Sequence, residues 1–126
     1  MNKYLFCLSV LGLAAAGCGG AVRTPDVYRD DTAKLLEAQA NQRIHDCFDG
    51  MVKTTPGPKS LAGTTTVHFV VAKESGLITN PTVIPESSTA QPQVQQCVVT
   101  ALNGLKLDPP DNVDGDATFT WEFVVQ

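Results

Sequence analysis

The amino-acid sequence predicts an α+β domain in which two helices cover one face of a three-stranded antiparallel sheet. Hydrophobic side chains recur at helical spacing in two segments and alternate in three others. These segments follow one another in the order α-β-β-α-β. The chain of 126 residues leaves room for one such domain, so a multidomain enzyme is excluded.

The charge balance argues against nucleic-acid binding. Nine Lys and Arg face 13 Asp and Glu, for a formal net charge of −4, so no basic surplus is available for phosphates. The hydrophobic share of 43% is too high for a disordered polymer. The composition therefore indicates an acidic folded domain, which at this size has a modest core and gains stability from a covalent cross-link.

Residues 1–17 are typical of a bacterial secretion signal. Lys3 precedes an apolar run that is too short to span a bilayer permanently. The run ends in Ala15-Ala16-Gly17-Cys18, which resembles the lipobox of bacterial lipoproteins. This resemblance implies that the signal peptide is removed and that Cys18 carries diacylglycerol and palmitate. An ordinary signal, cleaved at a small-residue site, is the alternative and would free the same domain into the periplasm.

Lipid on Cys18 would place the mature protein in the cell envelope, facing the periplasm. Gly19 after the cysteine resembles the sorting signal for the outer membrane of Gram-negative bacteria. Removal of the signal takes away Lys3 and no acid, so lipid rather than charge must hold the acidic chain to the membrane. Residues 18–31 show no periodicity and contain Pro25, which predicts a lipidated tether before the domain 32–126.

The first helix is expected to begin at Asp31 or Thr32, because either residue can cap it. An apolar stripe follows at helical spacing. Its members are Leu36, Ala40, Ile44, Cys47 and Met51, widened by Leu35, Phe48 and Val52. Residues 54–58 contain two prolines and a glycine, so the helix is expected to end there.

Two strands joined by a tight turn are expected after Gly63. Residues 64–72 are rich in β-branched side chains, and their inward face consists of Val67, Phe69 and Val71. A turn at 73–76 leads to a second extended run, 77–84, which completes a β-hairpin. Pro81 lacks a backbone donor, so this second strand is expected at a sheet edge.

A second helix and a terminal strand complete the pattern. Pro92 suits the first turn of a helix, which is expected to end near residues 103–104. After the acidic loop 109–115, residues 116–126 alternate between apolar and polar side chains over most of their length. This alternation places three aromatic side chains on one buried face, namely Phe119, Trp121 and Phe123.

The helix between the second and third strands predicts the strand order. It reverses the chain, so the third strand should run parallel to the second and antiparallel to the first. A fully antiparallel sheet then requires the first strand in the middle, giving the order 2-1-3. Both helices would cover the aromatic face of this sheet.

Two cysteines remain after the signal and the lipid site are set aside. Cys47 and Cys97 lie on the two predicted helices, above the same sheet face, and form the one possible pair in an oxidising compartment. A disulfide is expected, and closing a loop of about 50 residues would stabilise the fold by about 4 kcal/mol at most. Two free buried thiols are the alternative. Zinc is disfavoured because paired short spacings are missing.

Residues at fixed spacings also carry a resemblance to a known family. They are Gly63, Val67, Phe69, Val71, Gly76-Leu77-Ile78, Val83, Ser87-Ser88, Val94, Cys97-Val98, Leu105, Leu107 and Pro109. This layout, over roughly Leu35 to Gln126, resembles the TonB C-terminal-like domain. It is most similar to the AgmX/PglI-type C-terminal domain of myxobacterial and related proteins, in which a Cys before the first strand and a Cys in the second helix recur.

The resemblance implies a function in binding rather than catalysis. Members of that family are non-enzymatic envelope proteins, linked to motility or envelope transport machinery, that bind other envelope proteins. The family typically has Trp-x-Phe-Pro-x-Pro after the second helix, where this chain has Leu105, Leu107, Asp108 and Pro110. The resemblance therefore supports the fold more closely than it supports any shared partner.

His45-Asp46-Cys47 comes nearest to a nucleophile cluster. Neighbouring residues on a helix point about 100° apart, so these side chains do not form a hydrogen-bonded triad. His45 and Asp49 stand four residues apart and could share a metal ion, but two ligands do not make a site. A solvated helix face is expected instead, with no cofactor and no resident metal ion.

The other polar motifs also favour structural roles. His68 falls among threonines on the polar face of a strand, where it is expected to be exposed or to pair across the sheet. Ser87-Ser88 lacks the Gly-x-Ser-x-Gly elbow of hydrolases, so a cap or a turn is expected. The loop with Asp111, Asp114 and Asp116 lacks the spacing and the following Glu of an EF-hand. An adventitious calcium contact there stays open.

A sheet edge is the remaining candidate for a functional surface. In the order 2-1-3 the terminal strand has an unpaired edge, which can accept an extended peptide by β-augmentation. The residues expected to bind an envelope protein or a second copy of this chain are Thr118, Thr120, Glu122, Val124 and Val125. The expected function is that of a non-enzymatic adaptor. A structural lipoprotein without a discrete ligand, or a small periplasmic enzyme using His68 or the aspartate loop, are the alternatives.

Overall fold

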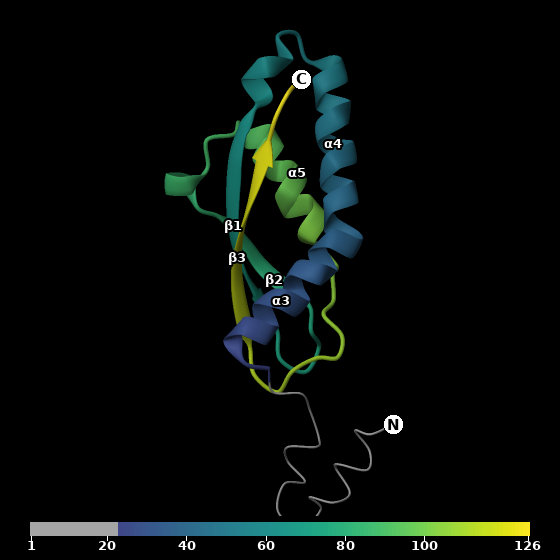
Figure 1. Ribbon diagram of the computed structural model, residues 1–126, viewed down its shortest axis with the longest axis vertical. Coiled ribbons are helices and arrows are strands. Elements are labelled where there is room, and N and C mark those ends of the chain that lie inside the picture. The colour runs from purple at the N-terminus through teal and green to yellow at the C-terminus, as the bar shows by residue number, and fades with distance from the viewer. Residues whose placement is uncertain (1–22) are drawn as a thin grey trace, which may run out of the picture.

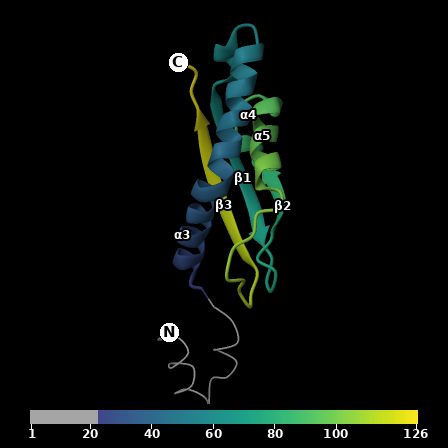
Figure 2. The same cartoon turned by 90° about the vertical axis from the view of Figure 1, so that its right-hand side faces the viewer.

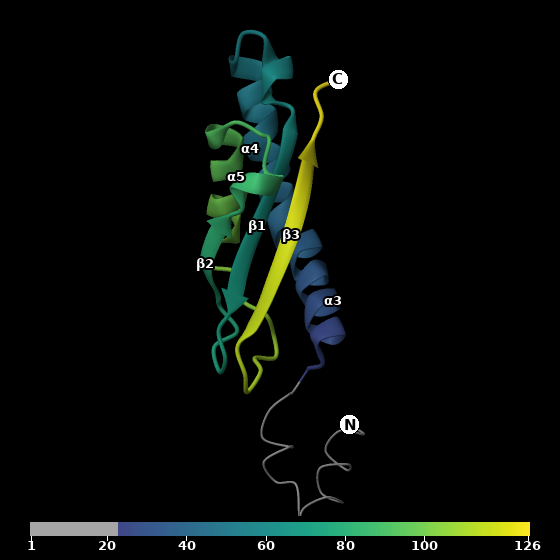
Figure 3. The ribbon, with the colours of Figure 1, turned by 90° about the vertical axis from the view of Figure 1, so that its left-hand side faces the viewer.

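Helices cover one face of a three-stranded sheet in the computed structural model, which describes residues 23–126 (Figure 1). The elements are α3 (Pro25–Leu35), the π-helical turn η1 (Leu36–Ala40), α4 (Asn41–Thr54), the 3₁₀ turn η2 (Pro58–Leu61), β1 (Gly63–Val71), β2 (Ile78–Val83), the 3₁₀ turn η3 (Pro85–Ser87), α5 (Pro92–Leu102) and β3 (Gly115–Phe123). Figure 2 shows α4 and α5 side by side over the sheet, and Figure 3 shows the opposite face, which these helices leave uncovered.

The sheet has the predicted strand order. β1 lies between β2 and β3 and is antiparallel to both. The pairing of β1 with β3 runs without interruption from Gly63↔Phe123 to Val71↔Gly115. The predicted α+β class and the order 2-1-3 are therefore confirmed.

The core forms between β1 and the helices. Val67, Phe69 and Val71 are at most 1% exposed, which confirms the predicted inward face of β1. The side chains that α5 buries against them are Val94, Cys97, Val98, Ala101 and Leu102. Pro92 opens α5 and Asn103 ends it, as predicted.

The first helix begins earlier than its apolar stripe indicated. α3 starts at Pro25, and the Thr24 Oγ1 accepts a hydrogen bond from the Val27 N–H at 3.3 Å. The expected cap at Asp31 or Thr32 is wrong. Thr followed by Pro is itself a helix-start signal, because Thr satisfies a free N–H and Pro has none to satisfy.

Residues 25–31 are therefore not part of the expected tether 18–31. Tyr28 is 6% exposed, Thr32 is fully buried, and the Thr32 hydroxyl donates to the Tyr28 carbonyl at 2.6 Å. These buried side chains offset the entropy lost when the segment becomes helical. The part of the expected tether before Arg23 lies outside the described residues.

A wide turn joins α3 to α4. In η1 the Asn41 N–H donates to the Leu36 carbonyl, five residues back. In an ideal α-helix, side chains at every fourth position are rotated by about 40° from one to the next around the helix axis. The wide turn takes up part of this rotation and keeps the stripe on the sheet side over both helices. The buried stripe is Tyr28, Thr32, Leu36, Ala40, Ile44 and Phe48.

A disulfide cross-links α4 to α5. The Cys47 and Cys97 sulfur atoms are bonded at 1.99 Å, and the two Cα atoms lie 5.9 Å apart. The predicted pairing is confirmed. The helices that cover the sheet are therefore covalently joined above it.

β2 is an edge strand with a bulge, as Pro81 indicated. The register of β1 against β2 shifts between His68 and Val70, which leaves Asn80 and Pro81 out of the pairing. A bulge tolerates proline because the extra residue makes no ladder bond. The predicted hairpin is thus confirmed, and Gly76 supplies the positive φ of 75° in its turn.

β3 ends sooner than its alternating pattern indicated. The expected strand 116–126 stops at Phe123, because the chain before Gly63 forms η2 and offers no further strand to pair with. Phe123 is 7% exposed, whereas Phe119 and Trp121 are half-buried. The prediction of three buried aromatics is therefore right about the face but wrong about the depth of two of them.

Candidate functional site

The edge of β3 that faces away from β1 is open. Within residues 23–126, β1 is the only strand that pairs with β3. An edge strand presents backbone N–H and C=O groups to which another strand can bind. The outer edge of β3 is therefore the first candidate for a functional surface.

Hydrogen bonds on the far side of β1 reveal which residues of β3 point their backbone outward. The Thr66 N–H donates to the Ser88 Oγ at 2.9 Å, and the Thr66 carbonyl accepts from the Ile84 N–H at 2.8 Å. Thr66 thus directs both groups away from β3. Its partner Thr120 occupies a non-hydrogen-bonded pair, so the N–H and C=O of Thr120 point to the open edge.

The same alternation applies to two further residues of β3. The Thr64 carbonyl accepts two backbone N–H groups from the segment after η3, at 2.9 Å each, so its partner Glu122 also points outward. Thr118 lies two residues before Thr120 and shares its orientation. Thr118, Thr120 and Glu122 are all exposed. Three of the predicted edge residues thus have accessible side chains and free backbone groups.

The two valines at the end of the predicted binding strand do not belong to β3. Val124 and Val125 follow Phe123 and have no partner on β1, so their expected place in the edge strand is wrong. Val124 is 62% exposed and lines a groove beside the strand. It contributes apolar surface rather than ladder pairing.

A groove of about 310 Å³ lies between α4 and the end of β3. The residues that line it are Asn41, Ile44, His45, Phe48, Asp49, Trp121, Glu122, Phe123 and Val124. Its apolar wall includes the Phe48 and Phe123 rings, whose centroids lie 4.8 Å apart. The groove therefore offers aromatic and aliphatic surface directly beside the open backbone edge.

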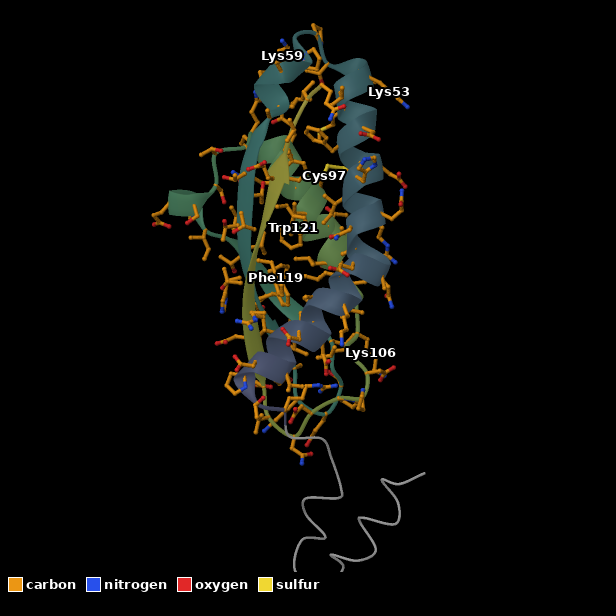
Figure 4. The ribbon with its side chains drawn as sticks, in the orientation of Figure 1. Lys53, Lys59, Cys97, Lys106, Phe119 and Trp121 are labelled. Carbon is orange, nitrogen blue, oxygen red and sulfur yellow. A yellow bond between two sulfur atoms is a disulfide. The ribbon has the colours of Figure 1, made fainter. Side chains whose placement is uncertain are left out.

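A second groove of about 190 Å³ continues along β3 toward α3. It is lined by Ala33, Leu36, Glu37, Asn41, Phe119, Thr120 and Trp121. The Trp121 Nε1–H donates to the Asn41 Oδ1 at 3.1 Å, so this pair forms the wall that both grooves share. Figure 4 shows Phe119 and Trp121 following one another along β3. Asn41 was not among the predicted site residues, because its spacing in the sequence marks no contact with β3.

Carboxylates line both of these grooves, which we call the Trp121 grooves. Glu37, Asp49 and Glu122 line them, and the described lining residues include neither Lys nor Arg. The one basic group in the lining is His45, whose Nδ1 lies 3.1 Å from the Asp49 Oδ2. The electrostatic character of the grooves is therefore acidic.

His45-Asp46-Cys47 does not form a nucleophile cluster. The Cys47 sulfur is bonded to Cys97 and offers no thiolate. The described residues contain no group of three or more His, Cys, Asp or Glu side chains that could hold a metal ion. The contact of His45 with Asp49 is thus an exposed pair between neighbouring turns of α4.

His68 and Ser88 serve the sheet. The His68 Nε2 lies 3.8 Å from the Asp116 Oδ2 across the β1–β3 pair, in agreement with the expected cross-sheet role. Ser88 binds the backbone of Thr66 through its Oγ. The segment Ser87-Ser88 therefore binds the edge of β1 at Thr64 and Thr66, where β2 does not reach. It does not cap α5, whose N-cap is Gln91.

The three aspartates of the acidic loop point to different partners. Asp111 is 2% exposed and accepts hydrogen bonds from backbone N–H groups, including that of Arg23 at 2.8 Å. The Asp114 Oδ1 accepts from the Lys73 N–H at 2.8 Å. Asp116 faces His68. Because the three carboxylates contact different partners, the loop has a structural role: it joins the start of α3 to the β1–β2 turn.

Arg23 forms a buried cluster at the start of β3. Its side chain is 5% exposed, and its Nε lies 2.8 Å from the Asp31 Oδ2. Its Nη2 donates to the Pro109 carbonyl at 2.7 Å, and its guanidinium stacks 5.5 Å from the centroid of the Tyr28 ring. We call Arg23, Tyr28, Asp31 and Asp111 the Arg23 cluster. The sequence carried no signal for it, because Arg23 and Asp111 lie 88 positions apart.

Tyr28 seals this cluster against the strand. Its hydroxyl donates to the Val113 carbonyl at 3.2 Å, and its ring covers Gly115, where any side chain would overlap the ring. Burial raises the pKa of the Tyr28 phenol, and the nearby Asp111 carboxylate raises it further. The neutral phenol is therefore the form that the folded protein favours.

The predicted lipid site, Cys18, lies outside the described residues, as does the predicted signal peptide. Among the helices of residues 23–126, none has the length and apolar character needed to cross a bilayer. No family model, curated protein or solved structure matches the chain in comparisons with known proteins.

Proposed function

We propose that this protein is a lipid-anchored, non-enzymatic adaptor of the bacterial envelope that binds an extended segment of a partner protein at the outer edge of β3. The observation that carries the proposal is the set of free backbone groups on Thr118, Thr120 and Glu122 beside the Trp121 grooves. Backbone pairing supplies affinity in strand addition, and pockets for alternate side chains supply specificity.

The geometry suits a strand whose side chains alternate. A segment added to β3 directs every second side chain to the helix side of the sheet. There the partly buried Phe119 and Trp121 offer apolar contact surface. Aromatic residues of this kind are frequent anchors in interfaces. A partner segment with alternating apolar residues fits this surface.

The charge of the grooves adds a preference. Glu37, Asp49 and Glu122 favour basic side chains on the partner and disfavour acidic ones. The α-β-β-α-β order and the 2-1-3 sheet support the expected kinship with TonB C-terminal-like domains of the AgmX/PglI type, whose members bind envelope proteins. Lipid on Cys18 would hold the adaptor to the membrane, with the outer membrane as the expected location.

A proline in β3 tests the proposal. Thr120→Pro removes an N–H that points to the open edge and leaves the ladder with β1 intact, so the fold should persist. Crosslinking of the lipoprotein in intact envelopes, followed by mass spectrometry, should identify partners that Thr120→Pro loses at least tenfold. Thr120→Val is the matched control, because it keeps the N–H and the β-branched shape.

The control decides how the result is interpreted. Partners captured equally by the wild-type chain, Thr120→Val and Thr120→Pro would contradict strand addition, provided that circular dichroism and thermal unfolding show all three chains folded. Removal of residues 124–126 gives a second test. It shortens the groove wall at Val124 but spares Phe123, which packs against Phe48 in the core.

A further inference from the structure

We infer that one end of the domain rests directly on the lipid bilayer. This membrane-facing end consists of Arg23–Val27, the turn Lys73–Leu77 and the loop Pro109–Asp114. The inference depends on the proposed lipidation of Cys18, and it goes further by assigning a lipid-contacting surface to the folded domain. Figure 1 shows the start of α3 and the loop before β3 at the same end of the molecule, opposite the C-terminus.

The Arg23 cluster determines how far the domain can stand from its anchor. Arg23 is held through its backbone N–H, its Nε and its Nη2, each at 2.8 Å or less from an oxygen of Asp111, Asp31 or Pro109. Only residues 19–22 separate Cys18 from this fixed point. Five extended residue steps span at most about 18 Å. The expected tether 18–31 would have reached more than twice as far.

Hydrogen bonds join the three segments of the membrane-facing end into one surface. The Tyr28 hydroxyl binds the Val113 carbonyl at 3.2 Å, next to the start of α3. The Glu74 N–H donates to the Asp111 carbonyl at 2.8 Å. The Lys73 N–H donates to the Asp114 Oδ1 at 2.8 Å. A short anchor on Arg23 therefore positions the loop and the turn together with the helix start.

Exposed apolar side chains gather at this end. Four large hydrophobic residues of the described chain are notably exposed, and three of them belong to the membrane-facing end: Val27 at 45%, Leu77 at 42% and Val113 at 48%. The fourth, Val124, is at the far end of β3, beside the Trp121 grooves. Apolar side chains next to a lipid anchor gain free energy by entering the interface between headgroups and acyl chains.

The charges of this end select the kind of headgroup. Its exposed acids are Asp26, Glu74 and Asp114, against the single exposed base Lys73. Anionic lipids repel such a surface. The surface therefore fits zwitterionic headgroups. In this orientation β3 points away from the bilayer, and its nine residues place the Trp121 grooves about 20–30 Å farther out, where a partner can reach them.

Fluorescence quenching tests this orientation. The lipidated protein carries Trp121→Phe as a background substitution, so that the introduced tryptophan is its one tryptophan. It is reconstituted into phosphatidylcholine vesicles in which part of the phosphatidylcholine has a nitroxide on its headgroup. Val113→Trp should lose more than half of its emission. Val124→Trp, the matched exposed valine at the other end, should lose less than a tenth. Equal quenching of the two variants would overturn the inference.

Two further readouts keep the outcomes separate. In the lipoprotein without any substitution, the fluorescence of Trp121 itself can be measured and should stay unquenched. Strong quenching of Trp121 would contradict the orientation. Replacement of half the phosphatidylcholine by phosphatidylglycerol should weaken the quenching of Val113→Trp, and stronger quenching would overturn the headgroup assignment.

Flotation with the vesicles distinguishes this inference from the proposed function. If the native protein fails to float, and Cys18→Ser behaves identically, the lipid anchor fails and the inference fails with it. If the native protein floats and Cys18→Ser does not, while Val113→Trp is quenched no more than Val124→Trp, the anchor stands and only the membrane-facing end is refuted.

Discussion

The two halves of β3 have the same alternating pattern and opposite surroundings. At its start, Gly115 lies under the Tyr28 ring, and the Arg23 cluster closes the space between α3 and the loop. At its end, Trp121 and Glu122 border two grooves and an unpaired edge. One half of the strand is thus built into the fold, and the other half is left available.

This difference shows how the fold restricts the proposed binding edge. An edge strand that is open along its whole length risks uncontrolled association. Here α3 and the Arg23 cluster occupy the start of β3, and the part near Trp121 faces the grooves. The closed half carries the buried charges, whose removal is costly, and the open half carries partly exposed side chains, whose removal is mild.

Loss of the buried Asp111 carboxylate should give the largest loss of stability and should loosen the start of β3, which we call the closed half. Asp111→Ala removes the fully buried one of the two carboxylates beside the Arg23 guanidinium and leaves the Arg23 N–H without its acceptor, which should cost about 3 kcal/mol in the free energy of unfolding. Urea denaturation at neutral pH measures this loss. Asp108→Ala, which lies immediately before the same loop and is exposed, should stay within about 0.5 kcal/mol of the wild type. Equal effects of the two substitutions would show that the cluster does not hold the closed half together.

Truncation of the tryptophan should have an intermediate effect on stability. Trp121 is half-buried, so Trp121→Ala should cost about 2 kcal/mol, less than the roughly 3–5 kcal/mol of a fully buried aromatic residue. Asn41→Ala removes only the hydrogen bond to Trp121 and should cost about 0.5 kcal/mol. Partner capture should fall for Trp121→Ala well beyond its effect on folding. A stability loss as large as that of Asp111→Ala would contradict the division between the two halves.

A smaller loss of stability than that of Trp121→Ala, and one that depends on pH, is expected at the start of β3. Tyr28→Phe loses the bond to the Val113 carbonyl, worth about 1 kcal/mol at pH 8. The pKa of Tyr28 is raised in the folded state, mainly by burial, whereas the pKa of an unfolded tyrosine is about 10. The stability due to the neutral phenol is complete below that pH and is lost as pH rises through the folded pKa.

The stability difference between wild type and Tyr28→Phe should therefore narrow above about pH 10. Chemical denaturation at several pH values checks this, and comparing the two chains cancels the groups they share. A difference that stays constant between pH 8 and pH 11 would show that the Tyr28 phenol is not held in its neutral form.

The sequence predicted the elements best where neighbouring residues decide them. Alternation from Val67 to Val71, Pro81 at an edge and Pro92 at a helix start all correspond to the structure. The helix start at Thr24-Pro25 also had a local signal, but the absence of an apolar stripe before Leu35 concealed it. The wide turn at η1 had none, because it results from fitting one helical stretch to the sheet.

The α+β class, the 2-1-3 order, the pairing of Cys47 with Cys97 and the inward faces of β1 and β3 could be predicted from the sequence alone. The class, the strand order and the faces follow from periodicity, chain reversal and turn residues, which act over short distances along the chain, and the cysteine pair follows because two cysteines remain on the predicted helices. The folded structure was needed to show that Thr120 points its backbone outward, that Trp121 borders a groove and that Arg23 binds Asp111. Each of these depends on the register and packing of segments far apart in sequence, and no local pattern encodes such a contact.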